Sequence, residues 1–217
     1  MSIDDSLSRR HVLDSAGAIN WRDKNQVIDA LKSNGNMLKY ASQELQDDRE
    51  VVLVAIKANG HALRYASENL RADKDIVLVA VTQQGTALQY ASKDLKNDSD
   101  VVMATIEQNW NAFGWASKER RGQKSFVMKA ISTSPKALHW ASDELKNDDE
   151  VVMAAVLQDE DSFGYAGENI KREVGNNNPT KYYRSKQLYE KLLPEIEAMH
   201  RHEVEIEEPI QKSRLKI

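Results

Sequence analysis

"NGHALRYASENLRADKDIVLVAV" (residues 59–81) is followed by a near copy of itself, "QGTALQYASKDLKNDSDVVMATI" (residues 84–106), so the chain repeats with a period of 25 residues. An aromatic residue marks the same place in six consecutive copies: Tyr40, Tyr65, Tyr90, Trp115, Trp140 and Tyr165. An Ala follows each aromatic residue, and a Ser follows that Ala in every copy except the last, which has Gly167. A gapless repeat of this length is typical of a solenoid of stacked units.

Each copy predicts two short helices. The first, "DREVVLVAIKANG" (residues 48–60), opens on Asp48, whose carboxylate can accept hydrogen bonds from the free amides of a first helical turn. Its apolar residues share one face: Val52, Ala55 and Ile56. The Asn-Gly or Gln-Gly that follows predicts the end of the helix, with the glycine in the left-handed conformation. The second helix, "HALRYASENL" (residues 61–70), is expected to bury Leu63, Ala66 and Leu70.

These units predict an all-α fold. A helix of about ten residues is marginal alone in water, but stacked hairpins bury one another's apolar faces. We therefore expect an α-solenoid of six 25-residue helical hairpins over residues 22–172. The flanking segments are assigned as an N-terminal cap (1–21), a polar basic loop (173–184), a C-terminal capping helix (185–208) and a flexible tail (209–217).

The recurring aromatic residues have two interpretations. The favoured one is packing between units, with each ring edge-on to the next copy and the recurrent Ser near the Tyr hydroxyl. We therefore expect Tyr65, Tyr90 and Trp140 to be mostly buried. The alternative is an exposed ladder on which a peptide or a base could stack.

Composition excludes several classes of protein. The chain has 30 Lys and Arg against 34 Asp and Glu, a net charge of -4, which is not the balance of a nucleic-acid binder. It has no Cys, so disulfides and Cys-ligated zinc are excluded. No stretch approaches the roughly 20 apolar residues of a membrane-spanning helix, and the N-terminus lacks the apolar region of a Sec-type signal. No metal or cofactor is predicted, because His200 and His202 are wrongly spaced for zinc and the Asp-rich linkers for calcium.

The pattern D-x-x-V-V-x-x-A-[IV]-x-x-N-G-x-A-L-x-Y-A-S-x-x-L resembles a bacterial tandem helical repeat catalogued as a domain of unknown function and found in effector proteins of intracellular bacteria. The resemblance covers roughly residues 24–170. It implies helical repeats and an effector context, and it transfers no catalytic residue. The tail "HEVEIEEPIQKSRLKI" (residues 202–217) resembles the glutamate-rich C-terminal signal of type IV secreted effectors. That likeness implies delivery into a host cell; a solvated acidic helix end in a protein of the bacterial cytoplasm is the alternative.

Departures from the repeat pattern are concentrated in copy 4. Gly114 lies within a predicted helix between two large rings, so its missing side chain could open a notch. Arg120 replaces the Leu of other copies. The candidate partner-binding residues here are Trp110, Phe113, Gly114, Trp115, Lys118, Arg120 and Arg121. Aromatic residues beside Arg are typical of binding hot spots; local repacking or a bend in the array is the alternative.

Two further surfaces are candidates. A stripe of variable positions lies along one face of the second helix of each copy, and Arg64 and His139 belong to it. A basic segment containing Lys181, Arg184 and Lys186 could contact phosphates or an acidic partner. In both cases the alternative is ordinary solvated surface.

We expect a non-enzymatic protein-binding helical repeat scaffold, secreted as a bacterial effector that acts on a host protein. No P-loop, G-x-S-x-G or G-x-G-x-x-G motif is present. Two alternatives stay open: an enzyme or enzyme modulator with its site near copy 4 or the basic loop, and a binder of phosphorylated or anionic ligands. The sequence does not indicate an oligomeric state.

Overall fold

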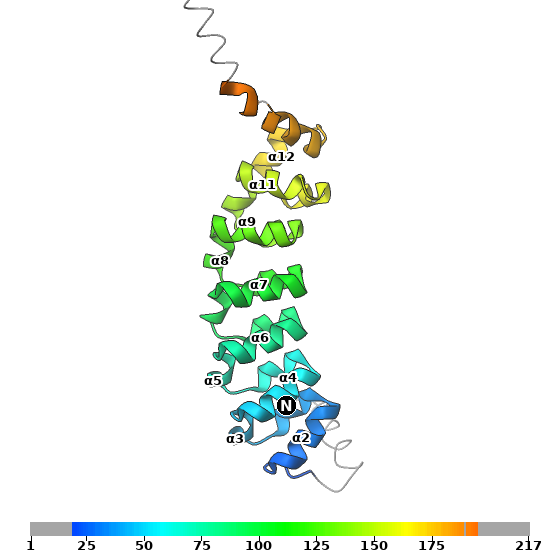
Figure 1. Cartoon of the computed structure of the whole chain (residues 1–217), viewed down its shortest axis with the longest axis vertical. Coiled ribbons are helices and arrows are strands. Elements are labelled where there is room, and N and C mark those ends of the chain that lie inside the picture. The colour runs from blue at the N-terminus through cyan, green and yellow to red at the C-terminus, as the bar shows by residue number, and fades with distance from the viewer. Residues whose placement is uncertain (1–18, 189, 195–217) are drawn as a thin grey trace, which may run out of the picture.

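The computed structural model describes residues 19–188 and 190–194, and all regular structure in these ranges is helical. The copies stack along one direction, from the blue N-terminal end to the orange C-terminal end of an elongated array (Figure 1). The predicted all-α solenoid is confirmed. Within the same residues, no helix has the length and apolar content needed to cross a bilayer.

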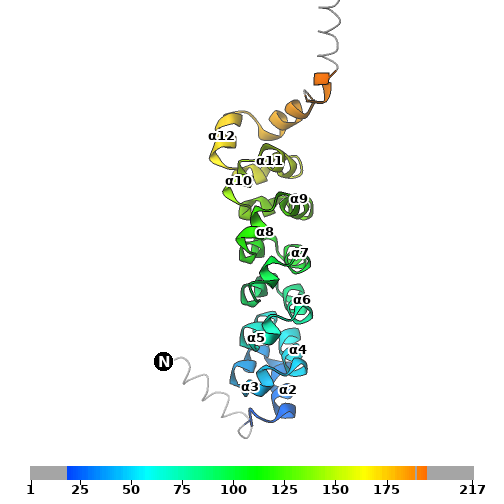
Figure 2. The same ribbon diagram turned by 90° about the vertical axis from the view of Figure 1, so that its left-hand side faces the viewer.

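A long α-helix opens each copy, and these helices lie one above another in a single column (Figure 2). They are α2 (Lys24–Ser33), α4 (Arg49–Ala58), α6 (Lys74–Gln83), α7 (Ser99–Gln108), α9 (Lys124–Thr133) and α11 (Asp149–Val156). The face predicted from the apolar spacing is the buried one: Val52, Ala55 and Ile56 are fully buried. Burial of these faces between neighbouring long helices forms one continuous core.

The second half of each copy differs from the prediction. A single helix was expected, but the structure has a 3₁₀ helix and then a separate short helix. The 3₁₀ helices are η1 (Gly35–Tyr40), η2 (Gly60–Tyr65), η3 (Gly85–Tyr90), η5 (Trp110–Trp115), η6 (Pro135–Trp140) and η7 (Glu160–Tyr165). The short helices are α3 (Gln43–Gln46), α5 (Glu68–Arg71), η4 (Leu95–Asn97), α8 (Lys118–Gly122), α10 (Asp143–Lys146) and α12 (Glu168–Val174).

The recurrent Ala-Ser pair explains the break. Ala66 is extended (φ -70°, ψ 156°), and the Ser67 hydroxyl accepts a hydrogen bond from Leu70 N at 3.2 Å. Ser67 is therefore the N-cap of α5, a role that Ser fills well. The sequence prediction placed this Ser beside the Tyr hydroxyl, because it treated residues 61–70 as one helix.

The predicted Asp caps are confirmed, and they also join neighbouring copies. Asp48 accepts hydrogen bonds from Glu50 N (2.9 Å) and Val51 N (3.1 Å). The cation that begins the preceding long helix pairs with the same carboxylate. The pairs of this kind are Lys24–Asp48, Arg49–Asp73, Lys74–Asp98 and Lys124–Asp148. Where the cap is Gln123, the partner position holds the uncharged Ser99.

The glycines after the long helices have a different role from the predicted one. Gly175 is the only described residue with positive φ (58°), so Gly35 and Gly60 are not left-handed. A Cβ on Gly35 would lie 2.1 Å from the Ala55 carbonyl oxygen, and one on Gly60 would lie 2.7 Å from the Ala80 oxygen. Glycine is needed because the backbone of the next copy lies directly against it.

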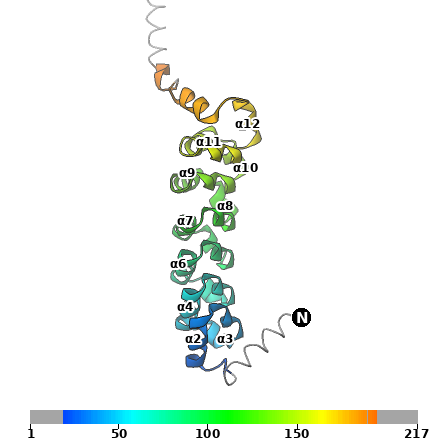
Figure 3. The same cartoon turned by 90° about the vertical axis from the view of Figure 1, so that its right-hand side faces the viewer.

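The two ends of the array differ in how far the structure describes them. The predicted N-terminal cap lies outside the described residues except for residues 19–21, where the Trp21 ring lies 5.3 Å from that of Tyr40. At the other end, the predicted loop 173–184 is mostly helical: α12 runs to Val174, and residues 179–188 form a helix that turns away from the array (Figure 3). The tail 209–217 and most of the predicted capping helix lie outside the described residues.

An N-cap signal explains the helix at residue 179. The Asn178 side-chain oxygen accepts from Lys181 N at 2.8 Å, and Pro179 occupies the first helical position, where proline is favoured. The sequence prediction treated "GNNNPT" as turn residues only and therefore began the helix too late.

Replacing Gly35 with Ala tests the close approach between copies. We expect Gly35→Ala to lower the free energy of unfolding by about 1–3 kcal/mol, because the new methyl group overlaps a backbone carbonyl. Gly164→Ala is the matched control, since nothing lies within 4 Å of a Cβ there. Its effect should stay within about 0.5 kcal/mol in denaturant titrations. Equal effects of the two changes would contradict the close-approach argument.

The Asp caps predict a loss of stability in acid. Burial raises the pKa of Asp48, but hydrogen bonds from Lys24 and from Val51 N outweigh burial and hold the pKa below its ordinary value of 3.8. The pKa values of Asp98 and Asp148 are also lowered, against burial, by their backbone and Lys partners. A pKa that is lower in the folded chain gives stability that is complete above the unfolded value and is lost as the pH falls through the folded value.

We therefore expect the denaturant midpoint to fall between about pH 5 and pH 2.5. A variant carrying Asp48→Asn, Asp98→Asn and Asp148→Asn should show a shallower fall, because Asn still caps a helix but does not titrate. Circular dichroism at a series of pH values measures both slopes. An unchanged slope in the triple variant would mean that other carboxylates control the acid response.

Candidate functional site

The aromatic row, defined as Tyr40, Tyr65, Tyr90, Trp115, Trp140 and Tyr165, lies at the boundary between the core and the solvent. Tyr65, Tyr90 and Trp140 are half-buried, and Trp115 is 47% exposed. Tyr65, Tyr90 and Trp140 pack against the core with most of their surface covered, so the prediction that these three rings are mostly buried is confirmed. The residue two positions earlier in each 3₁₀ helix is buried more deeply, such as Leu63, which is fully buried.

Cations and imidazoles contact these rings across neighbouring copies. The Arg64 guanidinium lies 4.9 Å from the centre of the Tyr65 ring and 5.7 Å from that of Tyr90. His61 meets the Tyr90 ring edge-on at 6.0 Å. Arg64, a predicted candidate, therefore belongs to the aromatic surface, where cation–π contacts stabilise a partly exposed ring.

Copies 4 to 6 bring three aromatic rings together around His139. The His139 ring lies 4.6 Å from Trp140, 4.8 Å from Tyr165 and 6.3 Å from Trp110. Burial lowers the pKa of His139, and the Lys146 ammonium lowers it further. The imidazole is therefore neutral at pH 7, and it packs as a polar ring within the cluster. The sequence prediction named Trp110 and His139 separately and did not bring them together.

Gly114 does not leave an open notch. A Cβ on Gly114 would lie 2.8–2.9 Å from three atoms of the Trp140 ring, so this ring from the next copy fills the space. The Trp140 Nε1 donates to the Asn111 side-chain oxygen at 3.1 Å, which fixes the ring. Phe113 is fully buried against Phe126, with the ring centres 6.0 Å apart. Phe113 therefore belongs to the core and presents no surface to a partner.

The two arginines of copy 4 also contact their own chain. Arg120 Nε donates to the Asn97 carbonyl at 3.0 Å, and its guanidinium lies 4.8 Å from the Phe126 ring. Arg121 donates from Nη1 to the Trp140 carbonyl at 3.3 Å. The Arg121 Nε is buried without a hydrogen-bond partner among the described residues. Arg120 thus joins copies 3 to 5, whereas Arg121 lies at the edge of the ring cluster.

Two neighbouring depressions flank His139. One, of about 400 Å³, is lined by Lys118, Arg121, His139, Trp140, Asp143 and Lys146 among others. The second, of about 460 Å³, shares His139, Asp143 and Lys146 with the first and continues to Tyr165 and Lys171. The sequence prediction missed Lys146. The sequence pattern could have identified Lys146, because a Lys or Arg recurs at this position every 25 residues.

The predicted basic patch separates into two parts. The Lys186 ammonium pairs with Asp149 at 2.6 Å and with Glu173 at 3.6 Å, whereas Lys181 and Arg184 are exposed. The hydrogen bond from Tyr182, followed by the charge of Lys186, lowers the pKa of Glu173. Lys186 therefore joins the C-terminal helix to the last repeat and is not available as a free phosphate contact.

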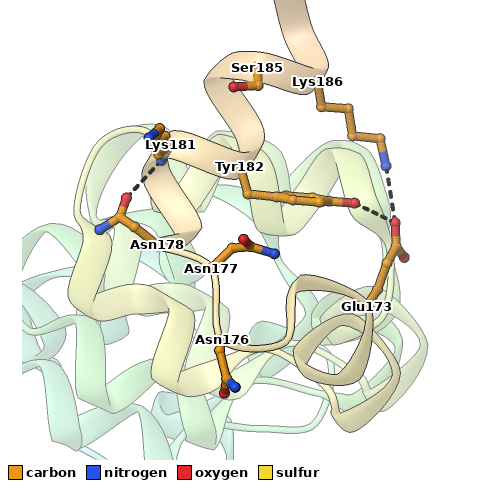
Figure 4. A pocket seen from close by; sticks show the side chains of 8 residues that line it. All are labelled: Glu173, Asn176, Asn177, Asn178, Lys181, Tyr182, Ser185 and Lys186. Atoms are coloured by element: carbon orange, nitrogen blue, oxygen red, sulfur yellow. Dashed lines mark hydrogen bonds and ion pairs between the residues drawn. The ribbon is translucent and has the colours of Figure 1, made fainter.

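A cavity of about 800 Å³ lies under this C-terminal helix (Figure 4). The Tyr182 ring lies across it, and the Tyr182 hydroxyl donates to Glu173 at 2.6 Å. Nearby, Tyr183 is fully buried, and burial raises the pKa of its hydroxyl far above the usual range. The Tyr182–Glu173 hydrogen bond and the Lys186–Glu173 ion pair join this helix to the last repeat at the cavity. Elsewhere in the described ranges, no group of three or more His, Asp or Glu side chains could hold a metal ion.

Replacing Phe113 and Trp115 with Ala, one at a time, should distinguish a core residue from a surface residue. We expect Phe113→Ala to lower the free energy of unfolding by about 3–5 kcal/mol, because it removes a fully buried ring. Trp115→Ala should cost less than about 1 kcal/mol, because half of that side chain is already in water. Denaturant titrations of both variants measure the difference. Comparable losses would show that Trp115 is also a core residue in solution.

Comparison with known proteins agrees with the repeat structure. Residues 23–71, 73–121 and 124–171 each match the domain of unknown function DUF4116. Each match spans two of the 25-residue copies, and the three cover about two thirds of the chain. No curated protein and no solved structure is significantly similar to the chain.

The matched segments end at or within the short helices α5, α8 and α12, and they include every ring of the cluster around His139. The relationship expected from the recurring Asp, Asn-Gly and Tyr-Ala-Ser positions is thus confirmed. The chain belongs to the DUF4116 family, as a tandem array of its helical repeats.

Proposed function

We propose that this protein is a non-enzymatic scaffold that binds a protein partner on the surface of its 3₁₀ helices. The observation that carries the proposal is the exposure of Trp115, which is 47% accessible and belongs to the same aromatic row as the half-buried Trp140 and Tyr165. Large aromatic residues that remain partly in water are enriched at the centres of protein interfaces. The stacked copies repeat this arrangement, so the surface can contact an extended partner.

The rigidity of the site supports this function. Contacts with Asn111 and Gly114 fix the Trp140 ring, and Trp110 and Tyr165 support His139. Rings that are already ordered lose little conformational entropy on binding. The surface is therefore prepared for a partner without rearrangement of the core.

The proposal extends to a secreted bacterial effector with a host partner. The support is the sequence of residues 202–217, in which four glutamates precede a short tail, as in type IV secretion signals. Removal of residues 202–217 should then abolish delivery of a reporter fusion into host cells, while the described repeats stay intact.

Capture followed by titration tests the scaffold function. The full chain, Trp115→Ala and Leu188→Ala are used as baits in host-cell and bacterial extracts. Leu188 is the control because it is an exposed apolar side chain on the C-terminal helix, outside the aromatic row. A protein captured from host extract by the wild type and by Leu188→Ala, but not by Trp115→Ala, is the expected result.

The purified partner is then titrated against the three chains. Trp115→Ala should weaken binding by about 30-fold, which corresponds to about 2 kcal/mol for a hot-spot residue. Circular dichroism controls for folding. Equal affinity of folded Trp115→Ala and the wild type would contradict the proposed surface, and a partner found only in bacterial extract would contradict the host assignment.

A further inference from the structure

A cation occupies the same position in five successive copies. This cation row consists of Arg71, Lys96, Arg121, Lys146 and Lys171, and the first copy has Gln46 there. All five side chains are half-buried. The row lies along the aromatic row, because Lys146 and Lys171 line the depression that contains Tyr165, and Arg121 and Lys146 line the one that contains Trp140.

Gln46 shows which part of this position is structural. Its side-chain amide donates to the Leu38 carbonyl at 3.1 Å and to the Ala41 carbonyl at 3.2 Å. These carbonyls lie at the C-terminal end of a 3₁₀ helix, and the Leu38 carbonyl also accepts from Ala41 N at 3.1 Å. The Lys96 ammonium makes a similar contact, since it donates to the Gln89 carbonyl at 2.6 Å. A neutral side chain is therefore sufficient for the fold, so the five positive charges need another explanation.

The cations are close enough to affect one another. Burial lowers the pKa of Lys96, and the nearby Arg71 guanidinium lowers it further. The Nε groups of Arg71 and Arg121 are buried without hydrogen-bond partners among the described residues. Lys146 has no ion-pair partner among the residues that the structure describes. Partly desolvated like charges in a row cost free energy unless an anion reaches them.

The carboxylates on the same surface do not neutralise the positive charges of the cation row. Glu68 lies 3.7 Å from Arg71, and Glu168 lies 3.4 Å from Lys171, but both glutamate side chains are more than 80% exposed. Exposed pairs of this kind are weak and are screened by salt. Asp143 lines both depressions without pairing to Lys146. A ligand carboxylate can therefore compete for the cations from the solvent side.

We propose that the cation row binds an extended acidic segment of the partner protein, with one carboxylate for each repeat. This inference rests on the proposed scaffold function and specifies its ligand. Packed helices lie about 8–10 Å apart. A segment in the polyproline II conformation has three residues per turn and rises about 3.1 Å per residue, so every third side chain lies on one face about 9 Å from the last and matches successive cations. The aromatic row then covers the residues between the carboxylates.

Fluorescence anisotropy with a labelled peptide of five Glu-Gly-Ser units tests the proposal. Five units provide one carboxylate for each cation of the row. A peptide of five Gln-Gly-Ser units controls for charge, and a peptide of the same composition with its five Glu in one block controls for spacing. The wild type should bind the spaced acidic peptide most tightly, and added salt should weaken that binding.

Substitution with glutamine removes the charge and leaves a side-chain amide donor, the group that Gln46 uses in the first copy. A variant carrying Lys96→Gln, Arg121→Gln and Lys146→Gln should stay folded and bind the spaced peptide roughly tenfold more weakly. The matched control carries Lys32→Gln, Lys57→Gln and Lys129→Gln, which remove three exposed charges from the long helices α2, α4 and α9. Its affinity should equal that of the wild type.

Several results would overturn the proposal: equal losses in the two triple variants, equal binding of the neutral peptide, or equally tight binding of a single-stranded oligonucleotide of the same charge. The proposed scaffold function fails separately. If Trp115→Ala abolishes partner capture but no acidic peptide binds, the scaffold stands and the acidic ligand is wrong. If an acidic peptide binds through the cation row but capture does not depend on Trp115, the ligand assignment stands and the aromatic surface is wrong.

Discussion

One backbone hydrogen bond, present in every copy, controls the geometry of this array. The amide that begins each short helix donates to a carbonyl near the end of the preceding short helix, as in Ser67 N to Gln46 O (2.9 Å) and Gly167 N to Lys146 O (2.7 Å). The bond joins residues 21 apart each time, so it fixes how one copy sits on the next. It also positions the ring two residues before the amide, so the aromatic residues recur along one side of the array at the edge of the core.

The later copies lose parts of the repeat pattern, and neighbouring residues compensate. Gly167 cannot cap α12 with a side chain, but the Asn147 side-chain oxygen accepts from Asn169 N at 3.0 Å instead. A Cβ at residue 167 would lie 2.2 Å from that oxygen, so the glycine makes the substitute cap possible. Gly114 likewise makes room for Trp140. These exchanges concentrate large rings in copies 4 to 6 while the column of long helices continues.

Structure and proposed function share the same positions. Four residues of the cation row, Arg71, Lys96, Arg121 and Lys146, accept the joining hydrogen bond through their backbone carbonyls, and the row lies beside the aromatic row. Any change in the stacking of copies therefore changes the spacing of rings and charges together. A partner that binds several copies would in turn hold those copies at one spacing, because repeat arrays contact mainly their nearest neighbours.

The sequence by itself determined the period, the all-α class, the Asp caps and the buried face of the long helices, because these depend on local spacing and on contacts repeated in every copy. It could not determine that Ala66-Ser67 breaks the second helix, since a Ser in an amphipathic stretch is compatible with either structure. It also could not place Phe113 in the core and Trp115 in water, because both are aromatic residues two positions apart in one 3₁₀ helix. Only the tertiary structure decided these points, since the exposure of each ring depends on which surface of the copy faces its neighbour. The same stacking brought Trp110, His139, Trp140 and Tyr165 together from three different copies.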